Sequence, residues 1–260
     1  MKKLTSLILI VLSLLMMLSL ASCNKETTSE IINNAVEKTN ALKEYEAKMD
    51  IVIDMSMSGM TMNIPMNVVT KVKNADTDTP TVLATTKTSV FGQEITTETY
   101  MDDEYVYVSM DGEGYKMSIE DSDGEYDYAS DIDDMLKNLP NDLIENIELT
   151  KNNDGSLTLN VNIPKETFAE IFDDFVEDMN EASGGASIDG VEISNCKVAI
   201  TVKDDYIKNY DISFNMEMTV EGMKTNSCVT AKMEFVNPGN AVTITPMDGY
   251  ESFEEFDGLD

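Results

Sequence analysis

Residues 45–72 read YEAKMDIVIDMSMSGMTMNIPMNVVTKV, with large apolar side chains at alternate positions through most of the stretch. A period of two is the pattern of a β-strand that buries one face. Ser58-Gly59 interrupts the alternation as a two-residue turn, which predicts a hairpin of two long strands. Pairing Met57 with Met60 across this turn gives both strands one continuous apolar face. The same register pairs Met55 with Met62 and Ile53 with Ile64.

Similar alternation predicts further strands along the chain, and stretches with a period near 3.6 predict helices. We expect helices over residues 29–43, 132–139 and 164–179, the last with Phe168 and Phe172 on its apolar face. Because sheet and helices each need a partner for their apolar sides, we expect an α+β fold. In it, a strongly curved antiparallel sheet of about ten strands forms a half-barrel that wraps the helices on its concave side. The further strands are expected near residues 81–90, 93–101, 104–110, 114–119, 146–151, 156–163, 190–203, 206–221 and 223–236.

The first residues have the features of an export signal. Lys2 and Lys3 precede an apolar run from Leu7 to Leu20 that is shorter than the ~20 residues a membrane span needs. The run ends in Leu20-Ala21-Ser22-Cys23, which resembles the lipobox of bacterial lipoproteins, where cleavage precedes a lipidated cysteine. We therefore expect residues 1–22 to be a signal peptide, residues 23–30 to be the lipidated Cys23 and a tether, and residues 31–260 to be one domain. The protein is expected to be lipid-anchored at the extracytoplasmic face of the cell membrane.

The charge balance argues against nucleic acid as a partner. The chain has 49 Asp and Glu against 18 basic residues, all of them Lys, for a formal net charge of −31. Nucleic-acid binding depends on Lys and Arg that neutralise phosphates, and here there is no Arg for bidentate contacts. The expected partner is therefore the membrane, reached through the lipid on Cys23.

The two cysteines of the folded part are predicted to lie on opposite faces of the sheet. Cys196 shares its parity with the apolar Val198 and Ile200, whereas Cys228 is out of phase with the apolar Val229 and Ala231. Cysteines on opposite faces cannot form a disulfide. A β-bulge that reverses one parity is the alternative.

The sequence offers little for catalysis. It has no His, the commonest general base, and neither a Gly-x-Ser-x-Gly elbow nor a phosphate-binding glycine loop. Ser194 and Lys197 match Ser-x-x-Lys, but residues three apart on a regular strand face opposite sides. We therefore expect a protein without enzymatic activity or cofactor.

The sequence suggests two metal sites, but each stretch has a simpler explanation. The acidic stretch 121–127 suggests calcium, but its Gly124 comes too early for an EF-hand loop, which favours a solvated loop. The many methionines suggest Cu(I), but they are spread along strand faces without His, which favours packing. No metal is expected.

The order of helix, long hairpin, short strands, helix, hairpin, helix and final meander resembles the half-barrel lipoprotein superfamily that includes LolA, LppX and LprG. Local runs such as Glu98-Thr99-Tyr100-Met101, followed by Tyr105-Val106-Tyr107-Val108, share in this resemblance. The resemblance implies an open half-barrel with a hydrophobic cavity that holds lipid acyl chains or other apolar ligands. This sequence differs from the mycobacterial members in its methionine-rich sheet and its acidity.

These observations predict a non-enzymatic lipoprotein that binds or carries a lipid or other hydrophobic ligand. Methionine is flexible enough to repack around different apolar guests, although the same side chains would also fill a solid core. An acidic module that binds another envelope protein, with a solid core and no small ligand, is the alternative. The residues expected to line the ligand chamber are Met49, Ile51, Ile53, Met55, Met62, Ile64, Met66, Phe168, Phe172, Phe214 and Met216.

Overall fold

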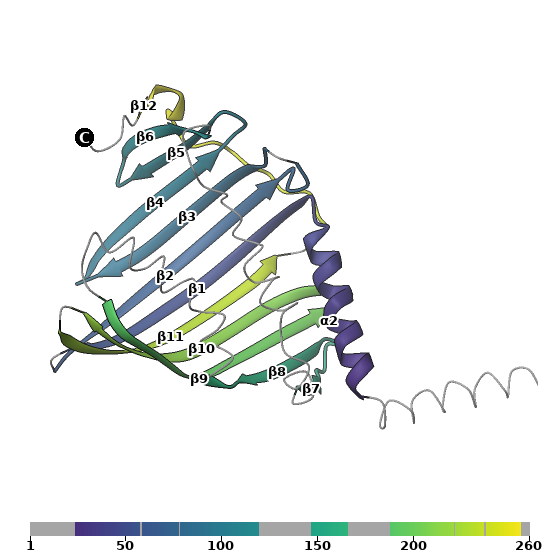
Figure 1. Cartoon of the computed structure of the whole chain (residues 1–260). Coiled ribbons are helices and arrows are strands. Elements are labelled where there is room, and N and C mark those ends of the chain that lie inside the picture. The colour runs from purple at the N-terminus through teal and green to yellow at the C-terminus, as the bar shows by residue number, and fades with distance from the viewer. Residues whose placement is uncertain are drawn as a thin grey trace, which may run out of the picture.

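The computed structural model describes residues 24–57, 59–77, 79–119, 147–165, 188–220, 222–236 and 238–255. Twelve strands form one open sheet in the order β12-β6-β5-β4-β3-β2-β1-β11-β10-β9-β8-β7 (Figure 1). Every neighbouring pair is antiparallel except β12 with β6. The elements are α2 (Asn24–Asn40), β1 (Glu44–Met57), β2 (Met60–Lys73), β3 (Thr81–Val90), β4 (Gln93–Met101), β5 (Tyr105–Met110), β6 (Glu113–Ser118), β7 (Glu148–Lys151), β8 (Leu157–Ile163), β9 (Ile188–Lys203), β10 (Tyr206–Val220), β11 (Met223–Val236), the 3-10 turn η2 (Tyr250–Ser252) and β12 (Glu254–Glu255).

The opening hairpin has the predicted register. Met57 lies opposite Met60, Met55 opposite Met62 and Ile53 opposite Ile64. The predicted strand positions agree with the strands to within a few residues, since the alternation continues over their whole length. One side of the sheet, here called the apolar face, carries Ile53, and the other, the polar face, carries Asp54.

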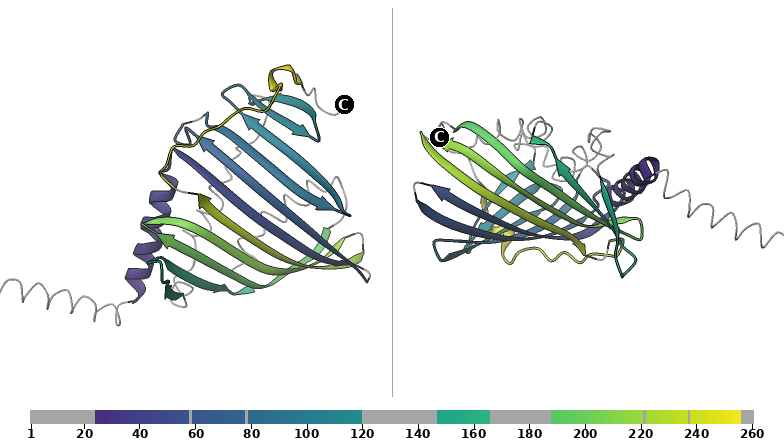
Figure 2. Two further views of the ribbon diagram at one scale, coloured as in Figure 1. Left: turned by 180° about the vertical axis from the view of Figure 1, so that it is seen from behind. Right: turned by 90° about the horizontal axis from the view of Figure 1, so that it is seen from below.

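The predicted fold class is wrong. Instead of about ten strands wrapped around helices, the described residues form an open twelve-stranded sheet, and α2 lies along one end of the strands (Figures 1 and 2). Alternation shows which face of a strand is buried, but it does not specify how strongly the sheet curves, which depends on twist and bulges. The expected helix over residues 132–139, and the one over 164–179 from residue 166 onward, lie outside the described residues.

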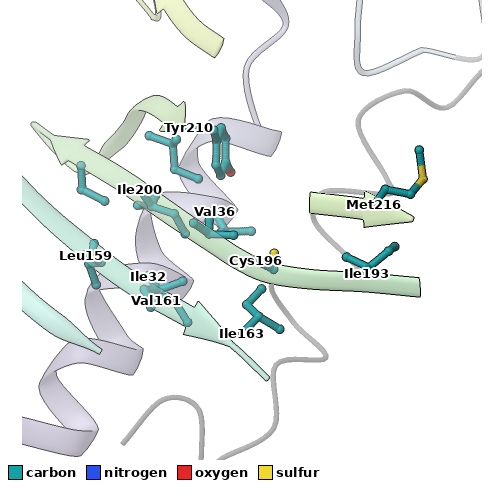
Figure 3. Close-up of a cluster of buried hydrophobic side chains, with 14 of the residues drawn as sticks. Ile32, Val36, Leu159, Val161, Ile163, Ile193, Cys196, Ile200, Tyr210 and Met216 are labelled. Carbon is teal, nitrogen blue, oxygen red and sulfur yellow. The ribbon is translucent and has the colours of Figure 1, made fainter. Parts of the chain in front are cut away.

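Helix α2 covers only the β8 to β10 part of the apolar face. Its buried Ile32, Ala35 and Val36 belong to one core with residues of β8, β9 and β10 (Figure 3). This short apolar stripe is too narrow to cover a sheet of twelve strands. The strand residues of this core are Leu159, Val161, Ile163, Ile193, Cys196, Val198, Ile200, Val202, Ile207, Tyr210, Met216 and Met218.

Polar contacts fix the C-terminal end of α2 to the β9–β10 turn. Thr39 Oγ1 donates to the carbonyl of Ala35 at 2.6 Å and accepts the backbone N–H of Ile207 at 2.9 Å. Lys38 Nζ donates to the carbonyl of Asp204 at 3.0 Å and lies 4.5 Å from the ring centroid of Tyr206. The Thr39 hydroxyl and the Ile207 N–H, both buried at this end of the helix, therefore have hydrogen-bond partners.

On the polar face, the C-terminal segment packs across β3 to β6. The Tyr250 ring meets the rings of Tyr100 and Tyr107 edge-on, at centroid distances of 5.1 and 4.9 Å. Burial, and secondarily the nearby Asp102 carboxylate, raises the pKa of Tyr107 to about 12. Through these ring contacts Tyr250 holds the C-terminal segment against the sheet.

Gly114 makes room for the end of this segment. The ring of Phe253 lies against it so closely that any Cβ at this position would collide with the ring. β12 follows directly and adds a short parallel strand to β6, which partly covers that edge of the sheet.

Leu159 and Leu149 are cross-strand partners that test this assignment of the core. Leu159 is fully buried, whereas Leu149 is 46% exposed. We expect Leu159→Ala to lower the free energy of unfolding by about 2–5 kcal/mol because it leaves a cavity. Leu149→Ala should change it by less than about 0.5 kcal/mol. Urea unfolding of both variants measures this, and equal losses would contradict the assigned core.

Candidate functional site

The apolar face is continuous over β2, β1, β11 and β10, which lie side by side. β11 separates the two long hairpins of the chain, because it pairs with β1 on one side and with β10 on the other. Side chains that are opposite each other across these strands form rows on one face. We call this surface the apolar panel. Its residues are Met60, Met62, Ile64, Met66 and Val68 of β2, Met49, Ile51, Ile53, Met55 and Met57 of β1, Thr225, Ser227, Val229, Ala231 and Met233 of β11, and Tyr210, Ile212, Phe214, Met216 and Met218 of β10.

All of the predicted lining residues that the structure describes lie on this panel. Phe214, for example, lies opposite Val229, which lies opposite Ile53, which lies opposite Ile64. Their role in ligand binding remains a prediction, and Phe168 and Phe172 lie outside the described residues. The predicted residues on the panel are Met49, Ile51, Ile53, Met55, Met62, Ile64, Met66, Phe214 and Met216.

The panel is not buried to the same depth throughout. Met216 and Met218 of β10 belong to the buried core, with 8% and 9% exposure. The panel residues of β1 are half-buried, and so are those of β2 apart from the exposed Met60. Part of the apolar surface is therefore accessible beside a close-packed core, as a binding surface for an apolar ligand requires.

Sequence reasoning missed the contribution of β11. The alternation did place Val229, Ala231 and Met233 on one side of their strand, but it gave no sign that this strand pairs with β1. It also gave no reason to single out Thr225 and Ser227, which share the panel with the apolar residues.

The polar face balances its charges between strands. Asp50 lies between Lys232 of β11 and Asn67 of β2, and the Asn67 amide donates a hydrogen bond to the Asp50 carboxylate. Asp54 accepts a similar bond from Asn63 at 2.7 Å. Such cross-strand pairs support the register that keeps the apolar side chains together on the other face.

Two hollows are formed by described residues, and neither is lined by a residue predicted for the ligand chamber. One, of about 380 Å³, lies between side-chain rows of the polar face that include Asn160, Lys197 and Lys232. The other, of about 210 Å³, lies between Ile31 of α2 and the turn at Asp204-Asp205. The candidate site is thus a broad face and not one of these hollows.

The cysteines lie as predicted, and both are free. Cys196 is buried, and Cys228 is exposed on the polar face opposite Asp54. The Ser194 and Lys197 prediction is wrong. A bulge at Asn195, whose φ is 56°, places Ser194 opposite Asn215 and Lys197 opposite Ser213, so both side chains are on the polar face.

Among the described residues, no group of three or more His, Cys, Asp or Glu side chains could hold a metal ion. The acidic stretch 121–127 lies outside them. No helix in the described part of the chain is both long enough and apolar enough to cross a membrane.

The sheet and its panel place this protein in the class of β-sheet proteins whose sheet has one apolar and one polar face. Within that class the chain belongs to the family of unknown function DUF6612, whose model matches residues 27–245. A search of curated proteins found no match.

Among solved structures, the chain is similar to LprF from Mycobacterium bovis, with 13% identity over 85% of this chain and 97% of that one, at a TM-score of 0.44. It is also similar to the ywiB protein from Bacillus subtilis, with 11% identity over 74% and 95% of the two chains and a TM-score of 0.21. A DUF1329 family protein from Desulfovibrio piger shares 9% identity over 84% and 94%, with a TM-score of 0.23. The expected resemblance to the superfamily of LolA, LppX and LprG stays a prediction.

Thiol labelling tests the assignment of the two faces. Burial raises the pKa of the Cys196 thiol to about 12, so the thiolate, which is the reactive form, is scarce at pH 8. For a chain of residues 24–260, we expect a maleimide to label Cys228 quickly and Cys196 only on unfolding. Mass spectrometry should therefore show one label on the Cys196→Ser variant and almost none on Cys228→Ser. Fast labelling of Cys228→Ser at pH 8 would contradict the assignment.

Proposed function

We propose that this protein is a lipid-anchored lipoprotein of the extracytoplasmic membrane face that binds a lipid or other hydrophobic molecule on its apolar panel. The observation that carries the proposal is the half-buried state of the panel residues on β1 and β2, next to a core that is fully buried. Large contiguous apolar patches on a protein that works in water mark binding sites.

The composition of the panel suits a guest without a fixed shape. Methionine supplies much of its surface on β1 and β2, and its unbranched thioether side chain adjusts to different apolar shapes. Burying this surface against an acyl chain contributes about 25 cal/mol for each Å² of apolar area removed from water. A broad apolar face of this kind favours a long flexible ligand over a compact rigid one.

The N-terminal sequence supports the anchor. Cys23 follows an apolar run and the small residues Ala21 and Ser22, as lipid attachment requires. α2 begins at the next residue, Asn24, and its other end is fixed to the β9–β10 turn. A lipid on Cys23 would therefore hold the sheet close to the membrane, within reach of its lipids.

The proposal includes no catalysis. The chain has no His, and Ser194 and Lys197 are both exposed on the polar face, away from the panel. An exposed serine and lysine in water have no desolvated pocket that would activate them.

Ile53 and Val52 give a matched test of the panel, since they are adjacent on β1 and point to opposite faces. Every described element lies within residues 24–255, so a chain of residues 24–260 keeps the whole sheet and α2. In this chain, native mass spectrometry should detect a bound apolar compound. Ile53→Lys should reduce the bound fraction at least about tenfold because a charge on the panel must be desolvated, whereas Val52→Lys should not.

Thermal unfolding of both variants serves as the control for folding. Binding that is lost equally in folded Ile53→Lys and Val52→Lys, or is absent from the unsubstituted chain, would contradict the proposal.

The anchor has its own test. We expect the full chain in a bacterial host to incorporate labelled fatty acid and to sediment with membranes, whereas Cys23→Ala should incorporate none, because it removes the sulfur that carries the lipid. Ser22→Ala is the control and should behave like the unsubstituted chain. Label on Cys23→Ala would disprove attachment at this residue.

A further inference from the structure

The panel contains two hydroxyl groups that make no hydrogen bond within the described part of the chain. Thr225 and Ser227 are 2% and 5% exposed, and among the described residues neither Thr225 Oγ1 nor Ser227 Oγ has a hydrogen-bond partner. Buried polar groups in folded proteins are nearly always hydrogen-bonded, because an unpartnered one loses its water without compensation. Two such groups, two residues apart on one strand, call for an explanation beyond packing.

Both hydroxyls lie among methionines at the end of the panel near the two hairpin turns. Thr225 lies between Met57 of β1 and Met218 of β10, and Ser227 lies between Met55 and Met216 in the next row. Residues at i and i+2 on a strand point to the same side and lie about 7 Å apart. The panel thus has a polar pair set within an otherwise apolar surface.

We propose that Thr225 and Ser227 hydrogen-bond the uncharged oxygen groups of an acyl ester lipid whose chain lies on the panel. This inference rests on the proposed function and narrows its ligand to a chemical class. A hydroxyl both donates and accepts, so each can pair with an ester carbonyl or with an alcohol. Two hydroxyls at this spacing suit a head with two oxygen functions, as in an acylglycerol.

The surroundings select against a fatty acid anion. The panel neighbours of the two hydroxyls are uncharged methionines. The nearest lysine along β11, Lys224, belongs to the polar face, where its Nζ lies 2.6 Å from Glu217 Oε2. A carboxylate placed beside Thr225 would therefore lose its water without gaining a described cation, in a chain of net charge −31. An ester or alcohol oxygen has no such cost.

The test compares monooleoylglycerol with oleate, which has the same acyl chain but a charged head. Residues 24–260 are titrated with each probe at pH 7 by native mass spectrometry. The unsubstituted chain should bind monooleoylglycerol more tightly than oleate. Thr225→Val with Ser227→Ala should weaken monooleoylglycerol binding about tenfold, through the loss of two neutral hydrogen bonds, and leave oleate binding unchanged.

Stability separates this role from a structural one. Removing an unpartnered buried hydroxyl should stabilise the ligand-free chain, so the double variant should unfold at a higher temperature while binding more weakly. Thr230→Val removes a hydroxyl from the polar face of the same strand. It should change neither the unfolding temperature of the chain nor its binding of monooleoylglycerol.

Three outcomes would overturn the hydroxyl anchor: unchanged monooleoylglycerol binding by the double variant, tighter binding of oleate than of monooleoylglycerol by the unsubstituted chain, or an equal loss on Thr230→Val. In these cases the panel still binds an apolar ligand, and the proposed function stands. A chain that binds neither probe and carries no apolar compound would overturn the anchor and the proposed function together.

Discussion

The antiparallel pairing of β1 with β11 is the contact on which the rest of the structure depends. Twelve residue pairs, from Glu46 opposite Val236 to Met57 opposite Thr225, join the strands near the N-terminus to those near the C-terminus. Without this pairing, β1–β6 and β7–β11 would be two separate sheets, and neither would have the full panel. The pairing is also the most costly to form, since it closes a loop of well over a hundred residues. Its strength comes from the whole row of apolar contacts and not from any one of them.

The same pairing explains why a chain with so many acidic residues folds into a sheet. Period-two alternation sends the charged residues to the polar face, where Lys232 and Asn67 flank Asp50. A register shift of one residue would place every charged side chain of a strand on the apolar face, so the charges themselves oppose slippage. The burial of the side chains varies across the apolar face, from the buried core beneath α2 to the half-buried methionines of β1 and β2. That gradient is the physical basis for our proposal that the half-buried part of the face binds a ligand, whereas the buried part stabilises the fold.

The features that depend on residues close together in the sequence were predicted correctly. The Met57–Met60 register, the strand positions and the opposite faces of Cys196 and Cys228 follow from alternation and a short turn. The placement of β11, the short strand β12 and the lack of a helix-filled barrel among the described residues depend on contacts between distant segments, which no local period encodes. The bulge at Asn195 shows the limit most clearly: one added residue moved Lys197 to the same face as Ser194. Likewise, Thr225 and Ser227 look like ordinary strand residues until their rows of methionine neighbours are known.

The central claim, that an acyl chain lies on the apolar panel, is tested most directly by NMR of the methionine methyl groups. Residues 24–260, labelled with ¹³C at the methionine methyls, would be loaded with an acylglycerol that carries a nitroxide on its chain. We expect the nitroxide to broaden the signals of Met55, Met62 and Met216. The signal of Met247, which is buried in the tyrosine cluster of the polar face, should stay sharp. Broadening of Met247 together with sharp signals from the three panel methionines would contradict it.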